Sequence, residues 1–246
     1  MIELHKPRKT LDIYDGQTIK FKNTNNKETA VMICRDEDPL DPRVDNDGII
    51  TRMICWHRRY NLGDKHTFTD TSDMLTSLLK ELDINVSDET EQDAPKMMSL
   101  LHNLAVVLPL WLYDHSGLTI SCGERSYPYN DTWDSGQIGW IILLKTDMIN
   151  AGLEVGDDWH KKALDICRDD VRIYDMWLTG EVYGYKLFEK EDDTWNETDS
   201  CWGFYGTNIL DNGMTEYIEG LSTAIETEEY EITNPTKHIS VVYDFD

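Results

Sequence analysis

Residues 111–145 read WLYDHSGLTISCGERSYPYNDTWDSGQIGWIILLK, in which two apolar runs flank a polar stretch. Apolar runs of this length are typical of buried strands, so we expect strands at 105–113, 118–121 and 138–144. The stretch between the runs is dense in Asp, His, Ser, Cys, Gly and Gln. A polar cluster held between buried strands is typical of a binding or catalytic site, and equally of a structured turn.

On the N-terminal side of this block, alternating and apolar-rich segments predict three strands and two short helices. The strands are expected at 18–22, 29–34 and 49–56, and the helices at 73–82 and 97–103. Thr71 or Ser72 is expected to cap the first helix. The charged segment 84–96 is a candidate linker, which would separate an N-terminal lobe at 1–95 from the rest of the chain.

On the C-terminal side, residues 157–178 have the clearest helical pattern, with Gly180 as the expected C-cap. A second amphipathic helix is expected at 213–227. The remaining strands are expected at 182–189, 201–205 and 238–243, the first two paired across an acidic loop at 190–200.

Helices and strands are therefore interspersed without the regular rhythm of βαβ units. This order predicts an α+β fold, in which a largely antiparallel or mixed sheet is packed by the two main helices, 157–178 and 213–227. A single domain of 246 residues is expected, with the separate lobe at 1–95 as the alternative.

The chain is strongly acidic, with 47 acidic and 23 basic residues and a net charge of −24. Such a chain repels phosphates, so we expect no direct binding of nucleic acid. The acids either form a solvated surface or imitate nucleic acid and occupy a basic groove on a partner. The expected contact surface consists of Glu189, Glu191, Asp192, Asp193, Glu197, Asp199, Glu226, Glu228, Glu229 and Glu231.

Cellular location follows from what the sequence lacks. The N-terminus has no apolar segment typical of a secretory signal, and the longest apolar run, 104–113, is shorter than the ~20 residues of a membrane span. The five cysteines form no CxxC pair, which favours free thiols in a cytoplasm. The seven histidines lack the spacing of a zinc site, so we expect no metal and no cofactor.

Asp114, His115 and Ser116 are consecutive and suggest a catalytic relay. Neighbouring side chains on an extended chain point to opposite faces, so these three cannot form a relay among themselves. The alternative is a tight turn formed by Asp114 and Ser116 and closed by Gly117.

A catalytic site in this region requires His115 to meet a more distant group, either Cys122 or Asp134. These three residues are weak candidates for the site of a small hydrolase. The polar cluster Asp114, Ser116, Ser135, Gln137 and Asp170 is the corresponding candidate for binding a small ligand.

Two further features of the sequence require a structural explanation. Gly136 and Gly139 permit close approach of the backbone to a ligand or to another strand, or else form a turn and a β-bulge. Asp170 lies in the middle of the apolar arc of its helix. A buried carboxylate needs a partner, for which Tyr183, His115 and an arginine are the candidates.

Four runs carry a resemblance: YDHSGLTIS (113–121), WDSGQIGWI (133–141), YDMWLTGEVYGY (174–185) and DSCWGFYG (199–206). They resemble an uncharacterised family of phage and mobile-element proteins of bacteria, over residues 100–210 or so. The resemblance brings no catalytic residues, and it implies an accessory protein in the cytoplasm of a bacterial host cell. We therefore expect a protein that binds and inhibits a host protein with a basic surface, such as a defence protein. A small hydrolase and a small-ligand binder are the alternatives.

Overall fold

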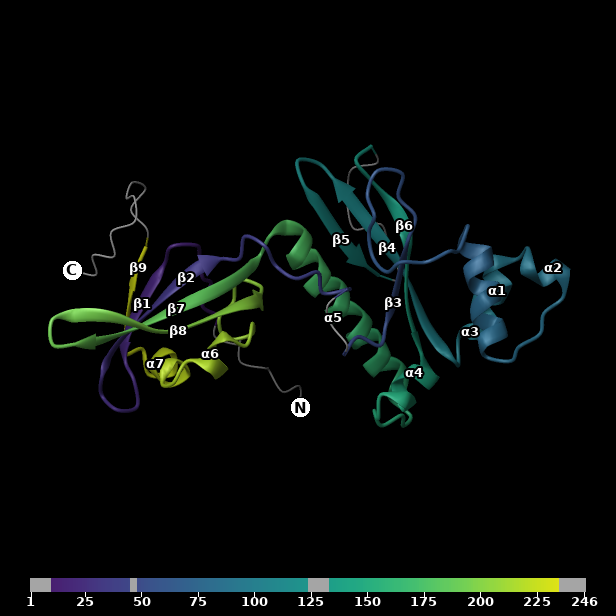
Figure 1. Ribbon diagram of the computed structural model, residues 1–246. Coiled ribbons are helices and arrows are strands. Elements are labelled where there is room, and N and C mark those ends of the chain that lie inside the picture. Colours follow the sequence, from purple (N-terminus) through teal and green to yellow (C-terminus); the bar gives the residue numbers. More distant parts are fainter. Residues whose placement is uncertain (1–9, 45–47, 124–132, 235–246) are drawn as a thin grey trace, which may run out of the picture. The chain divides into compact units, whose positions relative to one another are not determined.

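The computed structural model describes residues 10–44, 48–123 and 133–234, and the chain divides into two compact units (Figure 1). Unit 1 comprises Met1–Leu40 and Gly180–Asp246, and unit 2 comprises Asp41–Thr179. Each unit has its own sheet, and all strands that pair do so antiparallel. The fold is therefore α+β, as the sequence predicts.

Unit 1 contains a five-stranded sheet with the strand order β8-β7-β2-β1-β9. The strands are β1 (Thr18–Lys22), β2 (Glu28–Arg35), β7 (Val182–Glu191), β8 (Thr194–Tyr205) and β9 (Tyr230–Thr233). Side chains alternate across β1, so that Ile19 and Phe21 enter the core while Lys20 and Lys22 lie on the opposite face. Two short helices, α6 (Met214–Tyr217) and α7 (Leu221–Thr227), pack on this core (Figure 1).

Unit 1 corrects two expectations. The expected acidic loop at 190–200 is mostly strand, because β7 and β8 continue to a two-residue turn at Asp192 and Asp193, where Asp192 has φ 54°. The expected helix at 213–227 is broken between α6 and α7 at Gly220, which has φ 83° and cannot continue a right-handed helix. Strand β9 was not expected, and the expected strand at 238–243 lies outside the described residues.

Unit 2 contains a four-stranded sheet with the strand order β3-β6-β4-β5. The strands are β3 (Arg52–Cys55), β4 (Ala105–Asp114), β5 (Leu118–Cys122) and β6 (Ser135–Leu144). The helices are α1 (Thr71–Glu81), α2 (Asp88–Glu91), α3 (Ala94–Leu101), α4 (Lys145–Asn150) and α5 (Trp159–Thr179). Helix α5 lies on one face of the sheet and α1 and α3 on the other (Figure 1).

Both faces of the unit 2 sheet are buried. Along β6, Ile141 and Leu143 pack in the cluster that includes α5, whereas Ile142 and Leu144 pack in the cluster that includes α1 and α3. A strand covered on both faces has apolar side chains at every position. This explains the continuous apolar run IILL. A strand with one face in water would instead alternate apolar and polar residues.

The segment 84–96, the candidate linker in the alternative with a separate lobe at 1–95, does not divide the two compact units. It lies inside unit 2 and includes α2 and the start of α3, and Ile84, Val86 and Ala94 pack against the core of α1 and α3. The chain passes between the units after residues 40 and 179 instead. Among the helices of the described segments, none combines the length and apolarity that crossing a bilayer requires.

Candidate functional site

The polar block singled out in the sequence lines a cleft of about 400 Å³ in unit 2, which we name the β6 cleft. Its lining comes from the segment after β3, the end of β4 and the start of β6. The lining residues are Trp56, His57, Arg58, Arg59, Leu112, Asp114, Trp133, Asp134, Ser135, Gly136, Gln137 and Ile138.

The chain builds this cleft by continuing past β3 beside β6. The Trp56 N–H donates to the Ile138 carbonyl at 2.7 Å, which holds Trp56 beside β6. On the other side of β6, Leu112 of β4 pairs with Gly136. Of the turn and β-bulge considered for this segment, the structure has the bulge: residues 135–137 are strand, and Ile138 is the extra residue opposite Leu110 and Trp111.

The two glycines of β6 have different roles. A Cβ atom on Gly139 would lie 1.9 Å from the Ile54 carbonyl oxygen, so this glycine lets β3 approach β6. A Cβ atom on Gly136 would have no neighbour within 4 Å. Gly136 lines the β6 cleft, so it leaves the floor of the cleft open.

Two carboxylates of the cleft have basic partners. Asp114 forms an ion pair with Arg59. The Asp134 carboxylate lies 2.8 Å from Nδ1 of His115, whose ring stacks on Tyr113 with the centroids 5.9 Å apart. The structure thus brings His115 and Asp134 together, as the sequence allowed.

Cys122 lies elsewhere. It pairs with Leu110 along β5, four residues from the Asp114–Leu118 pair that closes the β4–β5 hairpin, a distance of ~13 Å along a strand. Its side chain packs toward the α5 core, where burial raises the pKa of the thiol to about 11. A catalytic thiol needs a lowered pKa and an adjacent base, so the proposed His115, Cys122 and Asp134 site is not assembled.

The segment from Asp114 to Gly117 connects β4 to β5. Ser116 has φ 60° there, a left-handed conformation that is typical of tight turns. Ser116 lies outside the lining of the β6 cleft, whereas Ser135 and Gln137 contribute to it. The polar cluster therefore separates into a turn and a cleft wall.

Asp170 belongs to a separate, buried cluster with Arg43, whose side chain is only 2% exposed. Its carboxylate accepts a hydrogen bond from the Thr51 hydroxyl at 2.5 Å and lies 3.7 Å from an Arg43 nitrogen. Arg43 also donates to both oxygens of Asp64, at 2.8 and 2.7 Å. The partner of Asp170 is thus an arginine, one of the three candidates, and the cluster is a structural one.

His57 in the β6 cleft is held in a defined orientation. Its Nδ1 accepts from the backbone N–H groups of Arg59 and Tyr60, at 3.4 and 3.2 Å, and its ring stacks on Tyr60. Burial, and then the nearby Arg59 charge, lower the pKa of His57. At neutral pH the ring is therefore uncharged, and because Nδ1 accepts, its proton is on Nε2.

The ten acidic residues expected to form a contact surface all lie in unit 1. Lys27 pairs with Glu189 and Glu191, at 2.6 and 3.1 Å. Lys186 pairs with Glu197 at 3.6 Å. These three carboxylates are thus partly neutralised within the unit.

Other members of this set have hydroxyl partners or lie at a turn. Tyr185 donates to Asp199 at 3.0 Å, and Thr227 donates to Glu229 at 3.2 Å. Asp192 and Asp193 form the exposed tip of the β7–β8 hairpin. The acidic side chains therefore belong to several different elements of unit 1 and are not arranged in a single row.

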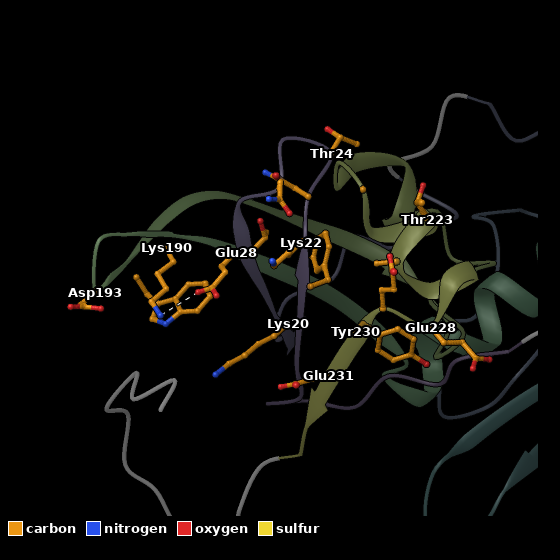
Figure 2. A pocket seen from close by; sticks show the side chains of 18 residues that line it. Lys20, Lys22, Thr24, Glu28, Lys190, Asp193, Thr223, Glu228, Tyr230 and Glu231 are labelled. Atoms are coloured by element: carbon orange, nitrogen blue, oxygen red, sulfur yellow. Dashed lines mark ion pairs between the residues drawn. The ribbon is translucent and has the colours of Figure 1, made fainter.

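A groove of about 1160 Å³ runs along unit 1 between β1, β2, the β7–β8 hairpin, α7 and β9 (Figure 2). Its charged residues have both signs: Lys20, Lys22, Lys190, Glu28, Asp193, Glu228, Glu229 and Glu231. Lys190 pairs with Glu28 at 3.2 Å, and the Lys20 ammonium lies 5.8 Å from the ring centre of Trp195. Figure 2 shows Asp193 at the outer end of this groove.

Sequence reasoning missed the segment CWHRRY, Cys55–Tyr60, which supplies one wall of the β6 cleft. Arg58 and Arg59 are the only adjacent arginines in the 246 residues, and they stand between aromatic side chains in a strongly acidic chain. This local positive charge in an acidic chain is the feature of the sequence that could have indicated the cleft wall.

Within the described part of the chain, no group of three or more His, Cys, Asp or Glu side chains could hold a metal ion. Comparisons with protein-family models, curated proteins and solved structures find nothing that matches the chain. The resemblance to phage and mobile-element proteins stays a prediction.

Proposed function

We propose that this protein acts by binding, and that the acidic surface of unit 1 contacts a basic surface of a host protein. The observation that carries the proposal is a charge surplus. The described residues of unit 1 include 20 acidic and 6 basic residues, a net charge of −14. Six cations cannot neutralise so many carboxylates, so most of this charge acts on the surroundings of the protein.

Uncompensated charge of one sign creates a potential that attracts a partner of the opposite sign and speeds their encounter. Basic surfaces of bacterial proteins are commonly those that bind nucleic acid. An acidic accessory protein of a mobile element would occupy such a surface and inhibit its owner. Defence proteins that act on nucleic acids are the class that we propose as partners.

Charge reversal tests the proposal without disturbing the core. The test variant combines Asp193→Lys, Glu226→Lys and Glu231→Lys, three exposed positions of unit 1. The matched control combines Glu89→Lys, Glu154→Lys and Asp157→Lys, three exposed positions of unit 2. Both variants change the net charge by the same amount, so a loss specific to the first one assigns the contact to unit 1.

The measurement is affinity capture from a nuclease-treated bacterial lysate, followed by titration with the captured protein. We expect the wild type and the control variant to bind, with an affinity that falls about tenfold or more between low and physiological salt. Added DNA should displace the acidic protein. Equal binding by the unit 1 variant, or binding that ignores salt, would refute the proposal.

A further inference from the structure

The β6 cleft contains a cationic group that the acidic surface of unit 1 does not explain. Arg58 lines the cleft and is exposed, and within the described residues no carboxylate pairs with it. Asp114, by contrast, pairs with Arg59, and Asp134 contacts His115. Among the described residues that line the cleft, the charge without a partner of opposite sign is therefore positive.

The overall charge of −24 does not cancel this local preference. At physiological salt, charges farther than about 8 Å apart in water are largely screened. A ligand in the cleft therefore responds mainly to the groups that line it.

We propose that the β6 cleft binds a small ligand that carries an oxyanion, a phosphate or a carboxylate, beside a flat ring. A guanidinium presents paired N–H donors that match the oxygens of either anion. The Nε2–H of His57 is a second donor in the same wall, because the Nδ1 atom of this ring is already engaged by backbone N–H groups.

Two tryptophans supply the surface for the ring. The indole N–H of Trp56 donates to the Phe68 carbonyl at 2.9 Å, which fixes the orientation of its ring in the cleft wall. Trp133 also lines the cleft. A flat ring is the kind of ligand group that stacks on an indole.

The dimensions of the cleft limit the ligand. Its volume of about 400 Å³ lies at the lower end of the range of small-molecule sites. Gly136 leaves the floor open, because no atom approaches the position of its missing Cβ. One ring with one anionic group fits this space.

The experiment is calorimetric titration of the full chain with four probes. Adenosine monophosphate has a ring and a phosphate, and indole-3-acetate has a ring and a carboxylate. Adenosine supplies the ring alone, and inorganic phosphate the anion alone. We expect at least one of the first two probes to bind about tenfold or more tightly than either half, and the preferred one identifies the anion.

Variants locate the binding. Arg58→Ala should lower the affinity for the preferred probe about tenfold or more. Arg172 is an exposed arginine of α5, and Arg172→Ala should leave this affinity unchanged. Trp133→Ala should lower the affinity for the ring-bearing anion and leave the affinity for inorganic phosphate unchanged. The triple charge reversal in unit 1 should have no effect, which separates this site from the proposed partner surface.

Two outcomes would overturn the proposal. One is an affinity for adenosine equal to that for adenosine monophosphate, together with no binding of indole-3-acetate. The other is wild-type affinity in Arg58→Ala. Absence of binding by all ring-bearing anions up to ~10 mM counts against it equally, because such an affinity is weaker than that of a specific site.

Discussion

At the scale of single residues, the buried cluster of unit 2 shows how desolvation and charge compete. Asp170 lies near the Arg43 cation, which favours its charged form, yet burial is the larger effect and raises its pKa above the usual value. The second carboxylate on Arg43, Asp64, acts in the same direction as burial. The cluster therefore has one cation for two carboxylates, at a site that is only partly open to water.

This imbalance predicts a pH dependence of stability. Because the folded state raises the pKa of Asp170, the contribution of this residue is full below the unfolded pKa of about 4 and is lost as the pH rises through the folded value. Asp170→Asn keeps an acceptor for Thr51 and does not titrate. Relative to wild type, its free energy of unfolding should therefore increase from about pH 4 to pH 7, measured by urea unfolding.

Asp169→Asn is the control for this measurement. Asp169 is the neighbouring residue on α5, and its side chain is 65% exposed, against 18% for Asp170. The Asp169 charge is one of the smaller causes that raise the pKa of Asp170, so the difference from wild type should rise much less with pH in that variant. A flat difference for Asp170→Asn would show that the carboxylate is not penalised by burial.

The start of α1 shows that the local sequence does not determine which residue caps a helix. Asp70, Thr71 and Ser72 are all good N-cap residues, so the local sequence cannot choose between them. The structure selects Asp70, which accepts from the Asp73 N–H at 3.0 Å. Thr71 instead accepts a hydrogen bond from the indole of Trp140 at 3.0 Å, a contact between residues distant in sequence.

At the scale of elements, β6 depends on the close approach of β3. Gly139→Ala would place a methyl group 1.9 Å from the Ile54 oxygen, so the two strands must separate. We expect this variant to lose about 3 kcal/mol or more of unfolding free energy. Gly136→Ala, in the same strand, meets open space and should change stability by no more than about 0.5 kcal/mol.

Denaturant unfolding of the two variants measures both values. Equal losses would show that the cost comes from replacing glycine in a strand in general, and not from the contact of β3 with β6. A stable Gly136→Ala variant has a second use, because Gly136 lines the β6 cleft and an added methyl group there should weaken binding of the ligand proposed for it.

The break between α6 and α7 is an element-level feature that periodicity cannot reveal. Met214, Ile218, Leu221 and Ile225 fit one helical stripe, and all are buried. Gly220 nevertheless has a left-handed backbone and lies against the β1–β2 turn, where a Cβ atom on it would be only 3.1 Å from the Asn23 Cα. The pattern predicts which residues are buried, whereas a distant turn decides where the helix breaks.

At the scale of the whole molecule, unit 2 is one continuous segment with its own core. The clusters on the two faces of its sheet consist of residues from 41–179. We therefore expect residues 41–179, expressed alone, to fold and to unfold cooperatively, because the excision exposes little of either cluster. Thermal unfolding by circular dichroism measures this.

The matched comparison is residues 96–246, which follow the candidate lobe at 1–95 that the sequence offered as the alternative to a single domain. This fragment lacks β1, β2, β3 and α1, and so loses strands from both sheets. It should not unfold cooperatively. Folding of 96–246 combined with failure of 41–179 would contradict the division into units.

By itself, the sequence determined the α+β class, most of the strands, the main helix α5 and the excess of acidic residues. These features follow from local periodicity and composition, which a single segment carries. The tertiary structure alone decided the division into two units, the pairing of β1 with β9, the partner of Asp170 and the walls of the β6 cleft. Each depends on contacts between residues far apart in the chain, which local patterns do not encode.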